Sequence, residues 1–496
     1  MTTAVSLDFG TSSLKVAVTD TDRGVLGEAD REYAIRQPFP TWAEQDPAEL
    51  WDLAGEACRE AVAGSAVSPD EVDAVVIVAP WKAVIPVSAD GDVLCDGIIW
   101  LDGRASEEAA AVSERYGLES IGGQSYWPRL LWLRAHRADV WRRAAWLMGL
   151  PTYFKWRATG QVVTDPSDDF FRNPERPLTG LGEQLARDFE FGSDAAKFAP
   201  VRPCMEVIGE LTEAGASHLG LPPGTRVVNG FGDLPAVTLG TTGFSENAAH
   251  IYFGTSSWLT VVTHGGRNLD APLSFTFDDS LGGAVFPLQT GMRAYNWITD
   301  QVFKDLAAPG TPAYYAEINR QVGEIPAGSD NLLATHWLVG ELPPLAKSAK
   351  GAFINLTANH DRRHMVRAVM ESICYTHRRY VEQLSAQHGL ELAEVVAVGG
   401  GALNDVLVQM LADVIQRDVL VPNGARHAGT RGAHICAEST IAGAAEPVPF
   451  PDPVEARRFR PDPSKAREYD RMYHLYLKIF PALRSLFAEL NHTEGP

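Results

Sequence analysis

The sequence lacks any long apolar run, and no stretch of 18 apolar residues occurs among its 496 positions. A membrane-spanning helix is therefore not expected. The opening "MTTAVSLDFG" has no charged and apolar leader pattern, which predicts no signal peptide. The five cysteines are scattered and form no CxxC pair, so neither a disulfide framework nor structural zinc is expected. These absences indicate a cytoplasmic protein without a membrane partner.

Positive charge is also scarce. Lys and Arg total 43 against 63 Asp and Glu, which gives a net charge of −20. An acidic chain of this kind disfavours nucleic acid as a partner. The phosphate-binding loop GxxxxGK[ST] is absent, and the dinucleotide pattern GxGxxG fails at Asn404. A nicotinamide-dependent dehydrogenase is therefore disfavoured.

What the chain does contain is the same five-residue stretch twice. "FGTSS" stands at Phe9–Ser13 and again at Phe253–Ser257, each time between two strand-like runs. A single such turn is typical of any hairpin. A turn of small residues also exposes backbone N–H groups and hydroxyls to a phosphate. Two copies, one per half, predict a polyphosphate held from both sides.

Two carboxylates accompany these turns. Asp8 precedes the first turn, whereas Tyr252 precedes the second. One or two carboxylates together with phosphate oxygens and water suit Mg²⁺, so Asp8 is the predicted metal ligand. Asp233 follows the strand-like run Arg226–Asn229 in "NGFGDLPA", where it either faces a cleft or caps a helix.

The remaining pattern is that of an α/β protein. Apolar runs at Val75–Val78 and Val395–Val398 predict buried strands, and Pro47–Ala63 and Met365–Leu384 predict helices. In "VVAVGGGALNDVLVQMLADV", three glycines join a strand to a helix and permit close approach of a ligand. We expect domains at 1–245 and 246–445, followed by a helical tail at 446–496 that packs on the second domain.

These elements, in this order, resemble the FGGY family of carbohydrate kinases, and within it the xylulokinase group. "LDFGTSSLKV" and "IYFGTSSWLT" resemble its two phosphate motifs, and "VGGGALNDVLVQMLADV" its adenosine motif. "NGFGDLPA" resembles the segment with the catalytic aspartate, and "IIWLDGRA" the stretch beside the sugar. "TWAEQDPAELW" and "HAGTRGAHICA" also match family segments. The resemblance implies two ribonuclease-H-like domains of the actin-like ATPase superfamily with an ATP cleft between them.

The resemblance also implies a reaction and a set of site residues. The activity is ATP-dependent phosphorylation of a small sugar, a ketose such as a pentulose, or of a polyol. Asp233 accepts the hydroxyl proton with an ordinary carboxylate pKa, and Asp8 lies near Mg²⁺. Residues expected to contact ATP are Thr11, Ser12, Gly254, Thr255, Ser256, Gly400, Gly401 and Asn404. Residues expected beside the sugar are Trp81, Lys82, Trp100, Asp102, Arg104 and Asp233.

The sequence departs from the xylulokinase pattern only on the sugar side. The usual "GQMHG" segment is "APWKA" here, with Trp81 and Lys82 in place of the polar pair. Lys82 either points to solvent or adds a cation to the site. Leu342 stands where an arginine is usual, and the loop before Arg129 is short. We expect D-xylulose to be a poor substrate compared with another ketose, a polyol or a sugar acid.

Two alternatives remain besides a ketose or polyol kinase. One is a kinase of a sugar acid, and the other is a non-enzymatic actin-like ATP-binding protein. A homodimer is the one protein assembly that we consider.

Overall fold

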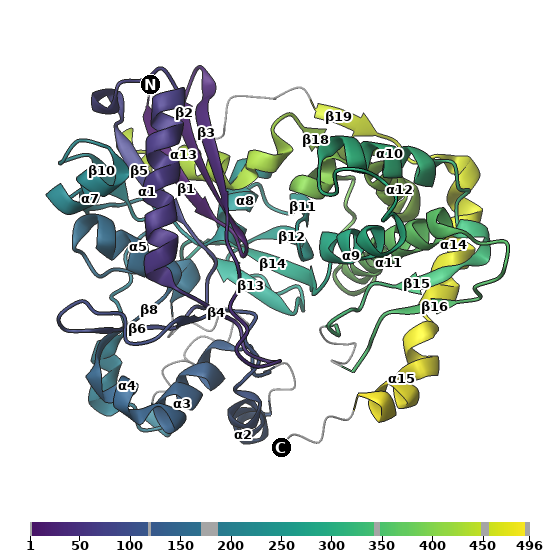
Figure 1. Cartoon of the computed structure of the whole chain (residues 1–496), viewed down its shortest axis with the longest axis horizontal. Helices are drawn as coiled ribbons and strands as arrows, with labels where there is room; N and C mark the ends of the chain where they lie inside the picture. Colours follow the sequence, from purple (N-terminus) through teal and green to yellow (C-terminus); the bar gives the residue numbers. More distant parts are fainter. Residues whose placement is uncertain (1, 118–120, 170–186, 342–347, 448–455, 492–496) are drawn as a thin grey trace.

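The computed structural model of the chain describes residues 2–117, 121–169, 187–341, 348–447 and 456–491. Two mixed sheets dominate the fold (Figure 1). The first has the order β3-β2-β1-β5-β10-β9 and the second β13-β14-β12-β11-β17-β18-β19. The first sheet has three antiparallel strands followed by two parallel ones, and the second has four antiparallel strands followed by two parallel ones. The predicted two-domain α/β fold is confirmed.

The strand bounds place the two identical turns at equivalent hairpins. The first sheet consists of β1 (Thr3–Phe9), β2 (Ser13–Asp20), β3 (Gly24–Glu32), β5 (Ala74–Val78), β9 (Val207–Glu210) and β10 (Arg226–Val228). The second consists of β11 (Ala249–Phe253), β12 (Ser257–His264), β13 (Leu273–Thr276), β14 (Leu281–Leu288), β17 (Glu394–Val398), β18 (Asp418–Pro422) and β19 (Ala456–Phe459). Short pairs complete the strands: β4 (Glu44–Gln45) with β7 (Gly97–Ile98), β6 (Ile85–Ser88) with β8 (Ala144–Met148), and β15 (Leu333–Thr335) with β16 (Ala352–Ile354).

Helices cover both faces of the first sheet. The first half contains α1 (Pro47–Gly64), α2 (Ser106–Tyr116), α3 (Tyr126–His136), α4 (Ala138–Arg143), α5 (Leu150–Thr159), α7 (Glu213–Leu219) and α8 (Asp233–Thr241), of which α2, α3 and α4 pack away from this sheet. Helix α1 begins because Asp46 accepts from the backbone N–H groups of Ala48 and Glu49 and Pro47 occupies the first turn. Its face with Trp51 and Cys58 packs on the sheet together with α5.

The helices of the second half are α9 (Met292–Val302), α10 (Pro312–Gly323), α11 (Arg362–His388), α12 (Asp405–Ile415), α13 (Ala428–Ile441), α14 (Pro463–Tyr476) and α15 (Ile479–Leu490). Helices α11 and α12 share the core of the second sheet. Helix α13 instead packs on β1 and β5 of the first sheet and crosses α8. Figure 1 shows α8 between the two sheets and α13 overlapping the strands of the first sheet in this view.

The tail differs in detail from the predicted single helix. It contributes strand β19 to the edge of the second sheet and then two helices, α14 and α15. The two helices are interrupted at Leu477–Lys478. Tyr473, Tyr476 and Phe487 are buried in the core of the second half. In the described part of the chain, no helix combines the length and apolar character needed to cross a membrane.

Candidate active site

The two Gly-Thr-Ser turns are each closed by a backbone hydrogen bond from their glycine, to the third residue after it in the first turn and to the second residue after it in the second. In the first, the backbone N–H of Gly10 donates to the carbonyl of Ser13 at 2.7 Å. In the second, the N–H of Gly254 donates to the carbonyl of Ser256 at 3.0 Å. Ser12 and Thr255 are exposed at the tips. Each half therefore presents a tight, small-residue loop at the end of its central hairpin.

One ladder position distinguishes the turns chemically. Asp8 lies opposite Lys15 in the first hairpin, and Tyr252 lies opposite Trp258 in the second. The second pair is stacked, with ring centroids 4.2 Å apart. The first turn thus carries a carboxylate and an ammonium group where the second carries an aromatic pair.

Asp8 is held against the start of α13. Its carboxylate lies so close to Gly429 that a β-carbon there would be 2.3 Å from an oxygen. Burial raises the pKa of Asp8, while the nearby Lys15 and His427 lower it. The Lys15 ammonium is itself fixed by the carbonyl of Arg426, 3.3 Å away. The first turn of one half therefore meets the α13 segment of the other.

Asp233 occupies the first turn of α8. Gly232 is the helix cap, and the Asp233 carboxylate accepts from the backbone N–H of Leu234 at 2.9 Å. Burial, and secondly the negative charge of Asp8, raise the pKa of Asp233 to about 7. The predicted ordinary pKa is therefore wrong, because the two carboxylates lie near each other in a partly buried site. Burial, and secondly the charges of Asp8 and Asp233, raise the pKa of Tyr33, whose hydroxyl donates to the carbonyl of Gly10.

The glycine segment after β17 lies on the second turn. Gly399 has φ 90° and packs on the backbone of Phe253, while Gly401 contacts Met292. Gly400 has open space where a side chain would stand. Asn404 caps α12, because its side-chain oxygen accepts from the N–H groups of residues 406 and 407.

In the "APWKA" segment, Lys82 does not point to solvent. It is only 5% exposed, and its ammonium lies 4.5 Å from the centroid of the Trp81 ring. Its backbone is left-handed, with φ 63°, and its N–H donates to Asp168 at 2.8 Å. Trp81 packs against Leu234 and the second-sheet residue Phe275. The "APWKA" segment therefore touches both halves.

The Trp100–Arg104 stretch is tied to the first turn. The indole N–H of Trp100 donates to the hydroxyl of Thr11 at 3.2 Å. Asp102 is fully buried and binds Arg104 at 2.7–2.8 Å, and Arg104 also binds Glu44. The Arg104 guanidinium lies 3.6 Å from the centroid of the Trp42 ring. The polar atoms of Asp102 and Arg104 are thus already engaged within the protein.

Several residues beside these sites were not predicted from the sequence. Lys15 and Tyr33 flank Asp8 and the first turn. Burial raises the pKa of Tyr252, and the charges of Asp8 and Asp233 act in the same direction. Asp168 anchors Lys82 and accepts from the Tyr126 hydroxyl at 3.2 Å. Burial, and secondly Asp165, raise the pKa of Asp168 to about 8. Of these residues, only Lys15 could have been predicted from the sequence, because the hairpin register places it opposite Asp8.

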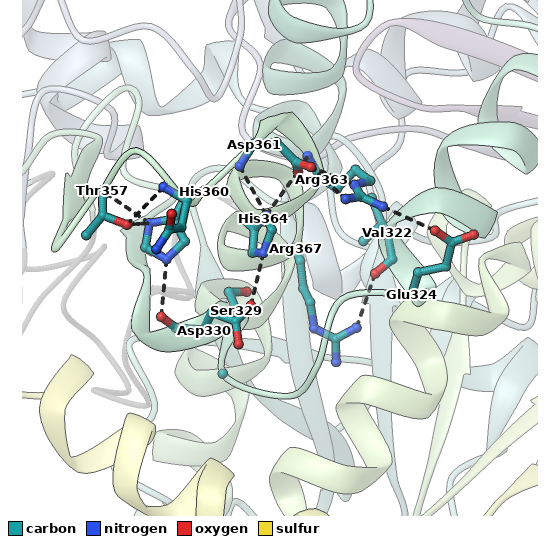
Figure 2. A network of polar contacts seen from close by, with 12 residues as sticks. Val322, Glu324, Ser329, Asp330, Thr357, His360, Asp361, Arg363, His364 and Arg367 are labelled. Atoms are coloured by element: carbon teal, nitrogen blue, oxygen red, sulfur yellow. Dashed lines mark hydrogen bonds and ion pairs between the residues drawn. The ribbon is translucent and has the colours of Figure 1, made fainter.

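Another cluster of histidines and aspartates lies at the start of α11 (Figure 2). There His364 binds Asp361 through Nδ1 at 2.9 Å and Asp330 through Nε2 at 3.1 Å. Both ring nitrogens are thus engaged, and this cluster fixes the loop at Ser329–Asp330 to the helix. Among the residues described, no group of three His, Cys, Asp or Glu side chains is arranged to hold a metal.

Comparison with known proteins identifies the architecture. Residues 3–170 match the N-terminal domain of the FGGY family of carbohydrate kinases, and residues 249–440 match its C-terminal domain. The chain belongs to the FGGY family. As a member of that family it is a carbohydrate kinase, which transfers phosphate to an alcohol group and uses ATP.

The relatives of this FGGY kinase are named for different substrates. It is 25% identical to a xylulose kinase of Bacillus subtilis over 510 residues, covering 97% of each chain. It is 26% identical to a glycerol kinase of Thermococcus gammatolerans over 446 residues, covering 84% of this chain and 85% of the relative.

Solved structures show the same fold. A ligand-bound xylulose kinase from Lactobacillus acidophilus superposes with a TM-score of 0.86 at 20% identity, covering 99% of this chain and all of that one. A gluconate kinase from the same organism superposes with a TM-score of 0.85 at 20% identity and the same coverage. The chain is therefore xylulokinase-like in fold and sequence.

Proposed function

We propose that the protein transfers the γ-phosphoryl group of ATP to a hydroxyl of a small ketose, such as a pentulose, or of a polyol. The observation that carries this proposal is the meeting of Asp8 and Asp233 beside the first Gly-Thr-Ser turn. One carboxylate comes from the end of β1 and the other from the start of α8. Burial, and secondly the charge of Asp8, raise the pKa of Asp233, which supports a shared site.

Asp233 is the proposed general base. The sugar oxygen attacks the γ-phosphorus, the bond to the ADP oxygen breaks, and the hydroxyl proton passes to the Asp233 carboxylate. Phosphoryl transfer has a loose transition state, so the base chiefly orients the hydroxyl and takes its proton late. A pKa near 7 suits this role better than an ordinary carboxylate pKa, because general bases work best when their pKa lies near the working pH.

The two turns are the proposed phosphate site. Thr11 and Ser12 reach the phosphates from the first half, and Gly254, Thr255 and Ser256 from the second. Their hydroxyls and backbone N–H groups would offset the charge of the phosphates without a Walker-type loop. Lys15, opposite Asp8, would add positive charge at the same place.

The donor chemistry of this site fits Mg²⁺. Asp8 and Asp233 are hard oxygen donors whose negative charge is disfavoured by burial and, for Asp233, by the neighbouring carboxylate. A divalent cation would relieve that cost, and Mg²⁺ commonly takes one or two carboxylates together with phosphate oxygens. We assign Asp8 as its protein ligand. Bound there, the ion would neutralise charge on the transferring phosphate.

The sugar is proposed to lie beside Trp81, Lys82 and Trp100. Trp100 touches Thr11, which brings the sugar segment next to the phosphate turn. Asp102 and Arg104 bind each other, so their proposed contribution is to hold Trp100 and the site wall in place. The buried Lys82 ammonium favours one second candidate, a sugar acid, since a cation suits a carboxylate substrate.

A substrate panel tests the proposal. The release of ADP with ATP and Mg²⁺ is measured for pentuloses, tetruloses, hexuloses, polyols and aldonates. We expect saturable turnover with a ketose or polyol, and a lower kcat/KM for D-xylulose because Trp81 and Lys82 change the polar pattern. Turnover with aldonates alone would favour the sugar-acid kinase. No turnover with any member would contradict the proposal, and a D-xylulose kcat/KM that is highest and above roughly 10⁴ M⁻¹s⁻¹ would contradict its specificity.

A further inference from the structure

We infer that Asn319 donates a hydrogen bond to the nucleoside part of ATP. Asn319 lies on α10, outside the glycine segment. The inference rests on the proposed function and deepens it. Asn404, the residue expected to reach the nucleotide, lies beside Asn319.

The side-chain oxygen of Asn404 and one of its two amide N–H donors are engaged within the protein. Its oxygen accepts from the backbone N–H of Val406 at 3.1 Å and of Leu407 at 3.2 Å. Its amide nitrogen donates to the side-chain oxygen of Asn319 at 2.9 Å. Because the oxygen faces two backbone donors, the orientation of the Asn404 amide is fixed.

That orientation fixes Asn319 in turn. The atom of Asn319 that faces the Asn404 nitrogen must be an acceptor, so it is the carbonyl oxygen. The same oxygen accepts from the Tyr295 hydroxyl at 2.7 Å. Both lone pairs of the oxygen are then used, and the two N–H donors of the amide point elsewhere. The described residues provide no acceptor for them, and the Asn319 side chain is partly exposed.

The three residues converge on the second phosphate turn. Tyr295 lies one turn into α9, and that helix begins where the N–H groups of Gly291 and Met292 donate to the carbonyls of Thr255 and Gly254. Asn319 and Asn404 lie on α10 and at the start of α12, which contact each other (Figure 1).

The space for a nucleoside lies in the same place. Gly401 packs on Met292, whereas the face of Gly400 is open. Leu403, which follows, is 58% exposed and offers an apolar surface. A nucleoside whose phosphates lie at the second turn can rest over Gly400, and the amide of Asn319 is then the polar group held next to it.

The ligand atom is an uncharged acceptor, either an adenine ring nitrogen or a ribose oxygen. Both have the same chemistry toward an amide N–H. Wild-type binding of 1-, 3- and 7-deaza-ATP and of 2′- and 3′-deoxy-ATP distinguishes them, because one analogue should lose the bond that the others keep.

The test is Asn319→Asp, which keeps both accepted hydrogen bonds and removes the donors. Calorimetric titration of the full chain with ATP and with ADP, without sugar, should show binding weakened about 10-fold. The melting temperature should be unchanged. Tripolyphosphate should bind both proteins equally, and the analogue that binds wild type poorly should show no further loss in the variant. The matched control Gln321→Glu, the same change two residues along α10, should bind ATP as wild type does.

The inference is overturned if Asn319→Asp binds ATP as tightly as wild type. It is also overturned if Gln321→Glu weakens binding equally, or if tripolyphosphate binding falls to the same extent, because charge alone would then explain the loss. If the variant melts at a lower temperature, the wild-type analogue series decides: equal binding of all analogues rejects the inference. Failure of wild type to bind ATP at all would instead contradict the proposed function.

Discussion

Asp233 is the proposed general base of the site. It lies at the start of α8, and its pKa is raised to about 7 by burial and by Asp8. Asp233→Asn keeps the shape of the side chain but removes the proton acceptor. We expect kcat to fall by roughly 10²- to 10⁴-fold with little change in ATP or sugar affinity. Steady-state kinetics checks this, and near wild-type turnover would remove Asp233 from the mechanism.

The raised pKa also predicts a pH dependence. Asp233 accepts a proton only when ionised, so kcat/KM for the sugar should decline as the pH falls below about 7. Folding stability should change with pH in the opposite direction to kcat/KM. A carboxyl group with a higher pKa in the folded state binds more protons than in the unfolded chain, so its contribution to stability decreases as pH rises from about 4 to 7. A kcat/KM profile that stays flat down to pH 5 would contradict this ionisation.

Asp8 is predicted to matter for the metal rather than for proton transfer. Asp8→Ala should raise the Mg²⁺ concentration needed for half-maximal activity, because the first turn alone carries a carboxylate. Asp22→Ala, at an acidic position on the following β2–β3 turn, serves as the control. A Mg²⁺ titration of Asp8→Ala that superposes on wild type would make Asp8 purely structural.

At the scale of elements, the crossing of α8 and α13 joins the two halves. A β-carbon on Gly432 would lie 1.9 Å from the carbonyl oxygen of Ala236, and one on Gly240 would lie 1.9 Å from that of Ala428. Gly432→Val should therefore lower the free energy of unfolding by at least about 1–3 kcal/mol, because the helices must separate. Denaturant unfolding measures this, with Gly64→Ala, which meets open space, as the control. Equal stability of the Gly432 variant and the control would show that the crossing is loose.

Elements with a strong local pattern were predictable from the sequence. Helix α1 and strand β5 follow from the Asp46–Pro47 start signal and from an unbroken apolar run. Strand β19 was not predictable, because its short, charged sequence becomes a strand only by pairing with β18. The predicted domain bounds stay a prediction.

At the scale of the whole molecule, contacts between distant segments also limit what the sequence alone predicts about the site. The turns and Asp233 carry their own local signals, but Tyr33, Asp168 and Asn319 gain importance only from partners far along the chain. Likewise, α13 belongs to the second half in sequence but covers the first sheet. Trp81, expected only beside the sugar, also packs on the second sheet through Phe275.

The central claim is that both halves hold the phosphates of one ATP during transfer to the sugar. Ser12→Ala and Ser256→Ala remove one hydroxyl from each turn, and the most direct measurement is the rate of sugar-phosphate formation at limiting ATP for wild type, both variants and the double variant. Each single change should lower kcat/KM for ATP about tenfold, the usual effect of losing a hydrogen bond to a charged group, while adenosine binding stays unchanged. The double variant should show a loss that is not the product of the two, because both contacts act on one ligand. Wild-type kcat/KM in either single variant would contradict the account, since only one turn would then contact the phosphates.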